Sequence, residues 1–294
     1  MKNTFLFLFF LYSFNLYGQE LQGKVPYASS NSWSNVREYV TIDTTDYLAM
    51  YALNALDIHD EDSYIDLQCL EIGRKTNKYS SRFVYVSDSL RTDYMLDPNA
   101  PDTWPNSWMP HGRNGYENWG ELKYHVLYVS EGNVRTYTRE PKRAYNGYYD
   151  EKYPAMKWLM QPETQIICDH TCQKATCSYH GRKFEAWFAL DIPFSYGPWK
   201  FGGLPGLILK VCDVDHLYTF ECVKLQSVHK PIQLVNGKYI DKPIDRNKVL
   251  EFERKVNINA NRVLQIQHFV SSGNSLKPVD KVFPDVTYEP LELE

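Results

Sequence analysis

The sequence lacks several features that would identify common classes of protein. No run of Lys or Arg is longer than a pair, and 32 basic residues are outnumbered by 36 acidic ones, which gives a net charge of −4. Binding to DNA or RNA by counterion release needs a basic surface, so the charge pattern argues against a nucleic-acid partner. The sequence also contains no internal repeat and no low-complexity linker. These absences favour a single globular domain.

Long hydrophobic runs are scarce as well. One apolar stretch, residues 5–12, follows the basic Lys2 and precedes the small residue Gly18. A membrane-spanning helix needs about 20 apolar residues. We therefore predict a secretory signal peptide at 1–18 rather than a membrane anchor. The mature domain is then 19–294, exported to the periplasm or the cell surface, with no transmembrane segment.

Cysteines are few, and none precedes Cys69, which excludes a lipoprotein anchor at the cleavage site. In an oxidising compartment we expect disulfides rather than thiol catalysts, and a metal site with nearby histidines is the weaker alternative. Cys168 and Cys172 could be bridged across a three-residue turn, whereas Cys172 and Cys177 would point to opposite faces of an unbroken strand. The disulfide candidates are Cys69, Cys168, Cys172, Cys177, Cys212 and Cys222.

Aromatic residues, in contrast, make up 15% of the chain, with 14 Phe, 7 Trp and 23 Tyr. Aromatic rings fit a pleated sheet and favour strands. A tight turn is predicted at Glu131-Gly132-Asn133 and another at Asn236-Gly237. The alternation of apolar and polar residues, with the β-formers, predicts strands at 36–42, 64–72, 78–86, 124–129, 134–138, 165–168, 172–179, 183–189, 207–212 and 217–225.

One segment has clear helical periodicity. Asp245 can cap it, and Val249, Phe252 and Val256 recur on one face. The predicted fold is mainly β: a single domain of antiparallel, strongly curved sheet or open barrel with one late helix. The proline-containing end, 277–294, is predicted to run extended along the surface.

One passage, residues 191–209, carries the sequence DIPFSYGPWKFGGLPGLIL. It resembles the signature of the GLPGLI family, whose six defining residues stand here at 203–208. The resemblance implies an exported protein of a Bacteroidota-type bacterium, from a family with no assigned biochemical activity. The chain is also loosely similar to the amino-terminal, non-catalytic, bowl-shaped module of one type of bacterial peptide-N-glycosidase.

The glycines and prolines of this passage predict a shaped loop rather than a flexible one, because glycine permits positive φ and proline stiffens the backbone. The loop could dock a partner, a glycan or an anionic group. It could equally be an irregular crossover packed under the sheet by Trp199 and Leu204. The candidate binding residues are Gly197, Pro198, Trp199, Lys200, Phe201, Gly202, Gly203, Leu204, Pro205 and Gly206.

A second candidate surface is the loop at 97–120, which is rich in Trp and Pro. Trp104, Trp108, Tyr116 and Trp119 could form a stacking platform for sugar rings, although packing of this loop onto the domain explains them as well. The chain differs from the common family pattern here and in its extra cysteines, so no role of these parts follows from the resemblance.

The sequence offers little catalytic chemistry. Ser195 lacks the Gly-x-Ser-x-Gly context of a nucleophile elbow, and Asp213, Asp215 and His216 are predicted to form a turn with solvated charges. Carboxylates such as Glu185, Asp191 and Glu221 are only weak candidates for a glycosidase pair. The leading hypothesis is a non-catalytic binding or accessory protein of the cell envelope, without cofactor or metal, that binds an envelope protein or a glycan or peptide ligand. The alternatives are a hydrolase that acts on glycans or peptides and a structural envelope component.

Overall fold

Eleven strands form one antiparallel sheet in the computed structural model, which describes residues 36–101, 112–113, 121–140, 143–234, 242–265, 268–272, 275–279, 285 and 287–293. The strands of this sheet are β1 (Val40–Leu53), β2 (Asp66–Gly73), β3 (Thr76–Ser81), β4 (Val126–Ser130), β5 (Asn133–Thr138), β6 (Gly147–Lys152), β7 (Leu159–Ile167), β8 (His170–Tyr179), β9 (Arg182–Ala189), β10 (Leu207–Asp213) and β11 (Thr219–Leu234). The other elements are the helices α1 (Arg82–Leu96), α2 (Glu121–Tyr124) and α3 (Arg246–Leu264), and a separate hairpin of β12 (His268–Ser272) and β13 (Ser275–Val279).

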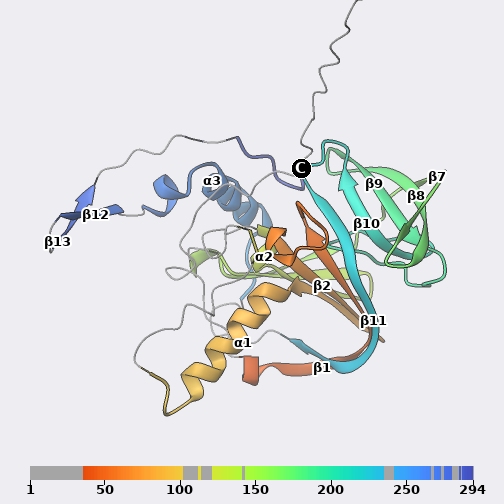
Figure 1. Cartoon of the computed structure of the whole chain (residues 1–294). Coiled ribbons are helices and arrows are strands. Elements are labelled where there is room, and N and C mark those ends of the chain that lie inside the picture. The colour runs from red at the N-terminus through yellow and green to blue at the C-terminus, as the bar shows by residue number, and fades with distance from the viewer. Residues whose placement is uncertain are drawn as a thin grey trace, which may run out of the picture.

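The sheet consists of two meanders. Strands β1 to β6 lie side by side in chain order, and so do strands β7 to β11. The two meanders join through a long ladder between β1 and β11, from the pair Val40 and Leu234 to the pair Leu53 and Phe220. Figure 1 shows these two strands running together along one side of the molecule.

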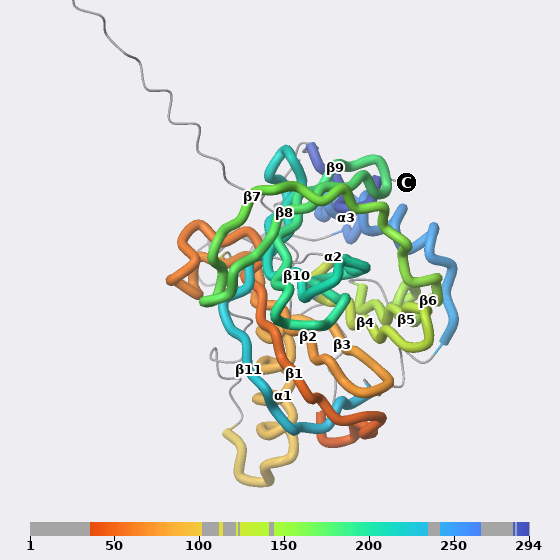
Figure 2. Tube along the Cα trace, turned by 90° about the vertical axis from the view of Figure 1, so that its right-hand side faces the viewer, coloured from red at the N-terminus to blue at the C-terminus, as the bar shows by residue number. Residues whose placement is uncertain are grey.

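The sheet curls but does not close. Its edge strands, β6 and β7, do not pair with each other, although only residues 153–158 connect them. A flat sheet of this many strands would be roughly 48 Å wide, whereas the connection can span at most about 25 Å. The two edges must therefore approach each other, which confirms the predicted strongly curved antiparallel sheet (Figure 2).

The edge strand β7 is irregular. It contains Pro162, and its register with β8 shifts between Met160 and Thr164. Most of its side chains are exposed. The ladder at this edge of the sheet is thus interrupted near its middle.

Most predicted strands are present with shifted ends, and β6, β12 and β13 are additional strands that the sequence pattern did not predict. Residues Val36–Glu38 form a 3-10 turn, so the first strand begins only at Val40. The turn between β4 and β5 is formed by Glu131 and Gly132, with φ of 51° and 71°, within the predicted turn Glu131-Gly132-Asn133. The predicted turn at 236–237 lies outside the described residues.

The prediction of a strand at 78–86 is wrong in its second half. Strand β3 ends at Ser81, whose side chain accepts a hydrogen bond from the Val84 backbone amide and so caps helix α1. The helix buries one side, which includes Phe83 and Val84. The β-branched and aromatic residues after the cap resemble a continuing strand, but the serine cap and the packing of α1 against β2 determine the helix.

Helix α3 begins where the sequence predicts. Asp245 accepts hydrogen bonds from the backbone amides of Asn247 and Lys248. The predicted apolar face is buried, but the same face also buries the polar residues Glu253 and Asn257. A carboxylate on the buried face of a helix needs an explanation, because an isolated charge is costly to remove from water.

Candidate functional site

The segment 197–206 lies inside the molecule. Trp199 is 6% exposed, and Lys200, Phe201 and Leu204 are each 1% exposed. Within the segment only Gly203 and Pro205 are exposed, whereas the others are buried, including Gly197, Pro198, Gly202 and Gly206. The segment therefore offers little surface of its own, and its part in docking a partner stays a prediction.

The connection at 153–158 holds this segment in place. The Trp158 indole donates a hydrogen bond to the Gly202 carbonyl oxygen at 2.8 Å, and the Tyr153 hydroxyl donates to the Phe201 carbonyl oxygen at 3.1 Å. A Cβ at Gly202 would collide with the Tyr153 hydroxyl. Glycine is thus required here for close packing.

Trp199 has a backbone conformation that is unusual for a large residue, with φ of 54°. Such a conformation costs about 1–3 kcal/mol and persists only where the surroundings impose it. The Trp199 ring stacks on His125, with ring centroids 5.9 Å apart and planes inclined by 21°. The Trp199 indole also donates a hydrogen bond to Glu292 at 3.1 Å.

Lys200 belongs to a network of four charged residues. Its ammonium group lies 3.0 Å from a carboxylate oxygen of Glu151 and 2.8 Å from Glu292. Arg246, from the first turn of α3, pairs with the same two carboxylates. Burial alone would raise the pKa of Glu292, but the charges and hydrogen bonds of Lys200 and Arg246 outweigh it and lower that pKa. Two cations and two anions thus balance; we call these four residues the Lys200 network.

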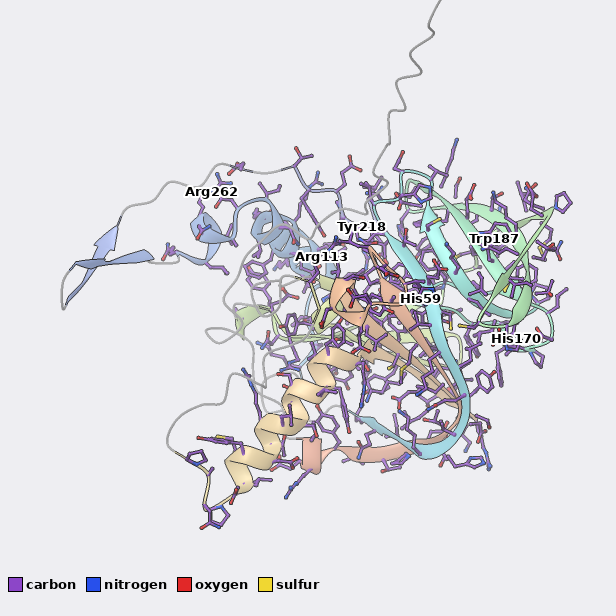
Figure 3. The ribbon with its side chains drawn as sticks, viewed as in Figure 1. His59, Arg113, His170, Trp187, Tyr218 and Arg262 are labelled. Carbon is purple, nitrogen blue, oxygen red and sulfur yellow. The ribbon has the colours of Figure 1, made fainter. Side chains whose placement is uncertain are left out.

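Residues 287–293 supply Glu292 and pack into the body of the molecule. Tyr288 and Leu291 are buried. The Tyr218 hydroxyl, labelled in Figure 3, donates a hydrogen bond to the Glu289 carbonyl oxygen at 2.9 Å. The predicted surface tail at 277–294 therefore differs from the structure in this part, because Tyr288, Leu291 and the Glu292 carboxylate are covered, although Leu293 is exposed.

A second group of buried ionisable residues adjoins the first. His125, between α2 and β4, is 2% exposed, Glu140, just after β5, is 0% exposed, and Glu253 of α3 is 1% exposed. The His125 Nε2 atom lies 2.6 Å from Glu253 Oε1 and 3.4 Å from Glu140 Oε1. We call these three residues the His125 cluster.

The charges of the His125 cluster do not balance. Burial lowers the pKa of His125, but the charge of Glu253 and the hydrogen bonds to both carboxylates outweigh it and raise that pKa to about 10. Burial, followed by the negative charge of Glu253, raises the pKa of Glu140 well above its usual range. One imidazole thus lies between two carboxylates, which compete for its positive charge.

A cavity of about 240 Å³ connects the two groups. It lies between α3, the segment around Trp199 and the residues 290–293, and we call it the α3 cavity. Its walls combine apolar and charged side chains. They are formed by His125, Tyr149, Trp199, Lys200, Leu250, Glu251, Glu253, Arg254, Pro290, Leu291, Glu292 and Leu293.

The six cysteines are all free thiols, so the predicted disulfides are not confirmed. In the ladder between β7 and β8, Cys172 faces Gln165, whereas Cys168 lies in the turn with φ of 46° and its thiol contacts the Cys222 carbonyl oxygen at 3.0 Å. The register therefore separates the predicted pair. Burial raises the pKa of Cys172 and Cys177 to about 12, so both thiols are protonated at neutral pH.

The other sequence candidates do not assemble into a site. His170 pairs with Asp191 at 2.6 Å on the β7–β10 part of the molecule, on the opposite side from Arg262 of α3 (Figure 3). Glu185 and Glu221 pair with lysines of neighbouring strands. The prediction of a solvated turn is wrong for Asp213, which is buried and bonded to Arg182 and to the Tyr218 backbone amide.

Trp104, Trp108 and Trp119 lie outside the described residues, so the proposed stacking platform stays a prediction. Among the described residues, His125, Glu140 and Glu253 bring three possible metal-ligand atoms close together. The cysteines and histidines at 168–180 do not. Sequence reasoning missed all three because they are far apart in the chain. The available signal was Glu253 itself, which follows Phe252 and lies on the apolar face of the predicted helix.

Comparison with models of known protein families gives a match for residues 180–210. These residues match a family described as "Protein of unknown function (Porph_ging)". The matched region contains Trp199 and Lys200 and is a small part of the chain. It supports a family of unknown function for this region but does not confirm the GLPGLI name. A search of curated proteins finds no match.

Two solved structures are similar in fold. They are described as "Structure of PNGF-II in C2 space group" and "Structure of PNGF-II in P21 space group", with 14% and 13% sequence identity and TM-scores of 0.44 and 0.45. They cover 80% and 79% of this chain. The chain spans only about a third of their length, 36% and 35%.

Proposed function

We propose that the protein is an exported cell-envelope protein with a non-catalytic binding or accessory role, and that the α3 cavity is its ligand site. The cavity carries this proposal, because it combines a large aromatic ring, Trp199, with fixed charges that can orient a ligand. Export is supported by the predicted signal peptide at 1–18. No helix within the described residues is both long and apolar enough to cross a membrane.

The size and walls of the cavity indicate the class of ligand. Its volume of about 240 Å³ lies below the usual range of pockets that enclose a whole drug-sized molecule. It therefore suits one sugar unit of a glycan or one side chain of a peptide. The faces of Tyr149 and Trp199 and the exposed cation of Arg254 offer apolar and polar contacts to such a group.

A variant that fills the cavity tests this proposal. Leu250 lines the cavity from α3 and is half-buried, so Leu250→Trp adds a ring at the mouth without removing a buried contact. Titration calorimetry against panels of short glycans and short peptides should show saturable binding by the wild-type chain. The affinity should fall at least about tenfold in Leu250→Trp.

The matched control is Leu90→Trp, the same change at an exposed position of α1. It should leave the affinity unchanged. Equal affinity of Leu250→Trp and the wild type would show that the ligand binds outside the α3 cavity. If the wild type binds neither panel, neither glycans nor peptides are its ligands.

A hydrolase is the second candidate function, because two carboxylates and an imidazole converge at the cavity wall. A glycosidase, however, must place two carboxyl groups on either side of the scissile bond. Glu253 lines the cavity but is only 1% exposed, and Glu140 is fully buried behind it. Turnover of a bound ligand that is abolished by Glu253→Gln would favour the hydrolase over the binding protein.

A further inference from the structure

The geometry points to a binding site for a divalent transition cation, of which Zn²⁺ is the type ion, formed by His125, Glu140 and Glu253 at the wall of the α3 cavity. The inference does not rest on the proposed function, since an ion could be held there whether or not the cavity takes an organic ligand. Nothing in the sequence pattern or in the family and fold comparisons assigns this site.

The positions of the ligand atoms support this site. One nitrogen and two carboxylate oxygens, each from a different part of the fold, all lie within 4.8 Å of one another. Ligands of a tetrahedral zinc ion lie about 2.0–2.1 Å from the metal and so about 3.3 Å apart. The separation of 3.4 Å between His125 Nε2 and Glu140 Oε1 already fits, and that of 2.6 Å to Glu253 needs only a small side-chain rotation.

Unsatisfied polar atoms in the cluster are the second observation. Within the described part of the chain, Glu140 Oε2 and Glu253 Oε2 are buried without a hydrogen-bond partner. Buried polar atoms are nearly always paired in folded proteins, so two such carboxylate oxygens in one cluster indicate an interaction that the protein atoms alone do not supply.

Charge balance is the third observation. With a metal bound, the cluster would hold a neutral imidazole and two carboxylates, and a divalent cation would neutralise their charge of −2. Lys200 and Arg246 are not available to do so, because they pair with Glu151 and Glu292, and the buried Arg139 next to Glu140 in the chain pairs with Asp88. Buried charges in proteins are either paired or bound to metals.

The donor set indicates the kind of metal. Imidazole nitrogen suits Zn²⁺ and related first-row ions, whereas Ca²⁺ and Mg²⁺ prefer oxygen ligands alone. Three protein ligands leave a fourth position of a tetrahedral ion open. His125 and Glu253 line the α3 cavity, so two of the three proposed ligands lie at its wall.

Metal titration of the full chain tests the site. After treatment with a chelator and dialysis, calorimetric titration with ZnSO₄ should give one equivalent bound to the wild type, confirmed by elemental analysis. Glu140→Gln and Glu253→Gln should each weaken binding at least about tenfold. The matched control is Glu251→Gln, an exposed carboxylate on the same helix that also lines the cavity, and it should leave zinc affinity unchanged.

Cobalt provides a readout that does not depend on the variants. Co²⁺ bound to the wild-type chain should give visible absorption without a thiolate charge-transfer band, because the proposed ligands are nitrogen and oxygen. Zinc binding that is equal in the wild type and both glutamine variants, or no stoichiometric binding by the wild type, would overturn the proposal. If a variant does not fold, as judged by circular dichroism, the wild-type cobalt spectrum is decisive: a thiolate band or no visible band counts against the site.

Discussion

The Lys200 network and the His125 cluster adjoin the same cavity, but their charges differ: positive and negative charges balance in the network and do not balance in the cluster. In the network two cations face two carboxylates, and Lys200, 1% exposed, contacts both. In the cluster one imidazole faces two carboxylates, and several of its atoms have no partner among the described residues. Arg246 and Glu151 of the network are partly exposed, whereas the cluster is fully buried, and the two groups differ above all in the balance of charge.

This difference separates a structural role from a binding role. A balanced network is damaged by the loss of any member, because the remaining charges stay buried without a partner. An unbalanced cluster is relieved when a like charge is removed. The sign of the stability change on neutralising one residue therefore distinguishes the two groups.

The largest effect is expected from Lys200→Met. The substitution leaves Glu151 and Glu292 with only Arg246, so the free energy of unfolding should fall by about 3–5 kcal/mol. Chemical denaturation followed by tryptophan fluorescence measures this change. Lys255→Met removes the exposed ion pair with Glu251 on α3 and should have no measurable effect. A loss no larger than that of this control would show that the Lys200 network is not structural.

An intermediate, pH-dependent effect is expected from Glu292→Gln. At neutral pH the variant should be about 2 kcal/mol less stable, because it loses charge-assisted hydrogen bonds. The pKa of Glu292 in the folded state lies below its ordinary value of 4.5. Its contribution is therefore fully present above pH 4.5 and is lost as the pH falls through the folded-state pKa. Denaturation curves from pH 7 to pH 3 should converge; a constant difference would contradict this sign.

The smallest effect, and the one of opposite sign, is expected from Glu140→Gln. With chelator present, the variant should be more stable than the wild type by about 1 kcal/mol, because one of two competing buried carboxylates becomes neutral at almost unchanged shape. Thermal melting measures the shift. A loss of more than about 1 kcal/mol would place Glu140 with the structural carboxylates instead.

The sequence predicted the sheet well because its signals are local. Alternation along each strand and the Asp245 cap depend on neighbouring residues, and most of the expected strands and α3 are present, although β1 and β7 extend well beyond their expected bounds and β6 was not expected. Helix α1 was missed because its first residues, Arg82 to Val86, include β-formers, and because the cap at Ser81 follows a true strand without a break.

The candidate site was predicted only in part. The segment at 197–206 was identified from its glycines and prolines, and two of its residues do line the cavity. His125, Glu140 and Glu253 come from three elements that only the tertiary fold brings together, so no spacing in the chain marks them. The pairing of cysteines failed for a related reason: Cys168 lies in the turn, and register rather than proximity in the chain decides which residues face each other.

The irregular strand β7 also has a consequence for the exposed edge of the open sheet. An open sheet exposes two edges, and an unpaired edge is a template for strands of other molecules. The longest strands, β1 and β11, are both central and paired on each side. The exposed edge at β7 carries Pro162, which has no amide hydrogen to donate, next to a shift of register. An incoming strand would therefore meet an interrupted ladder, so the curved sheet can stay open without offering β7 as a continuous template for self-association.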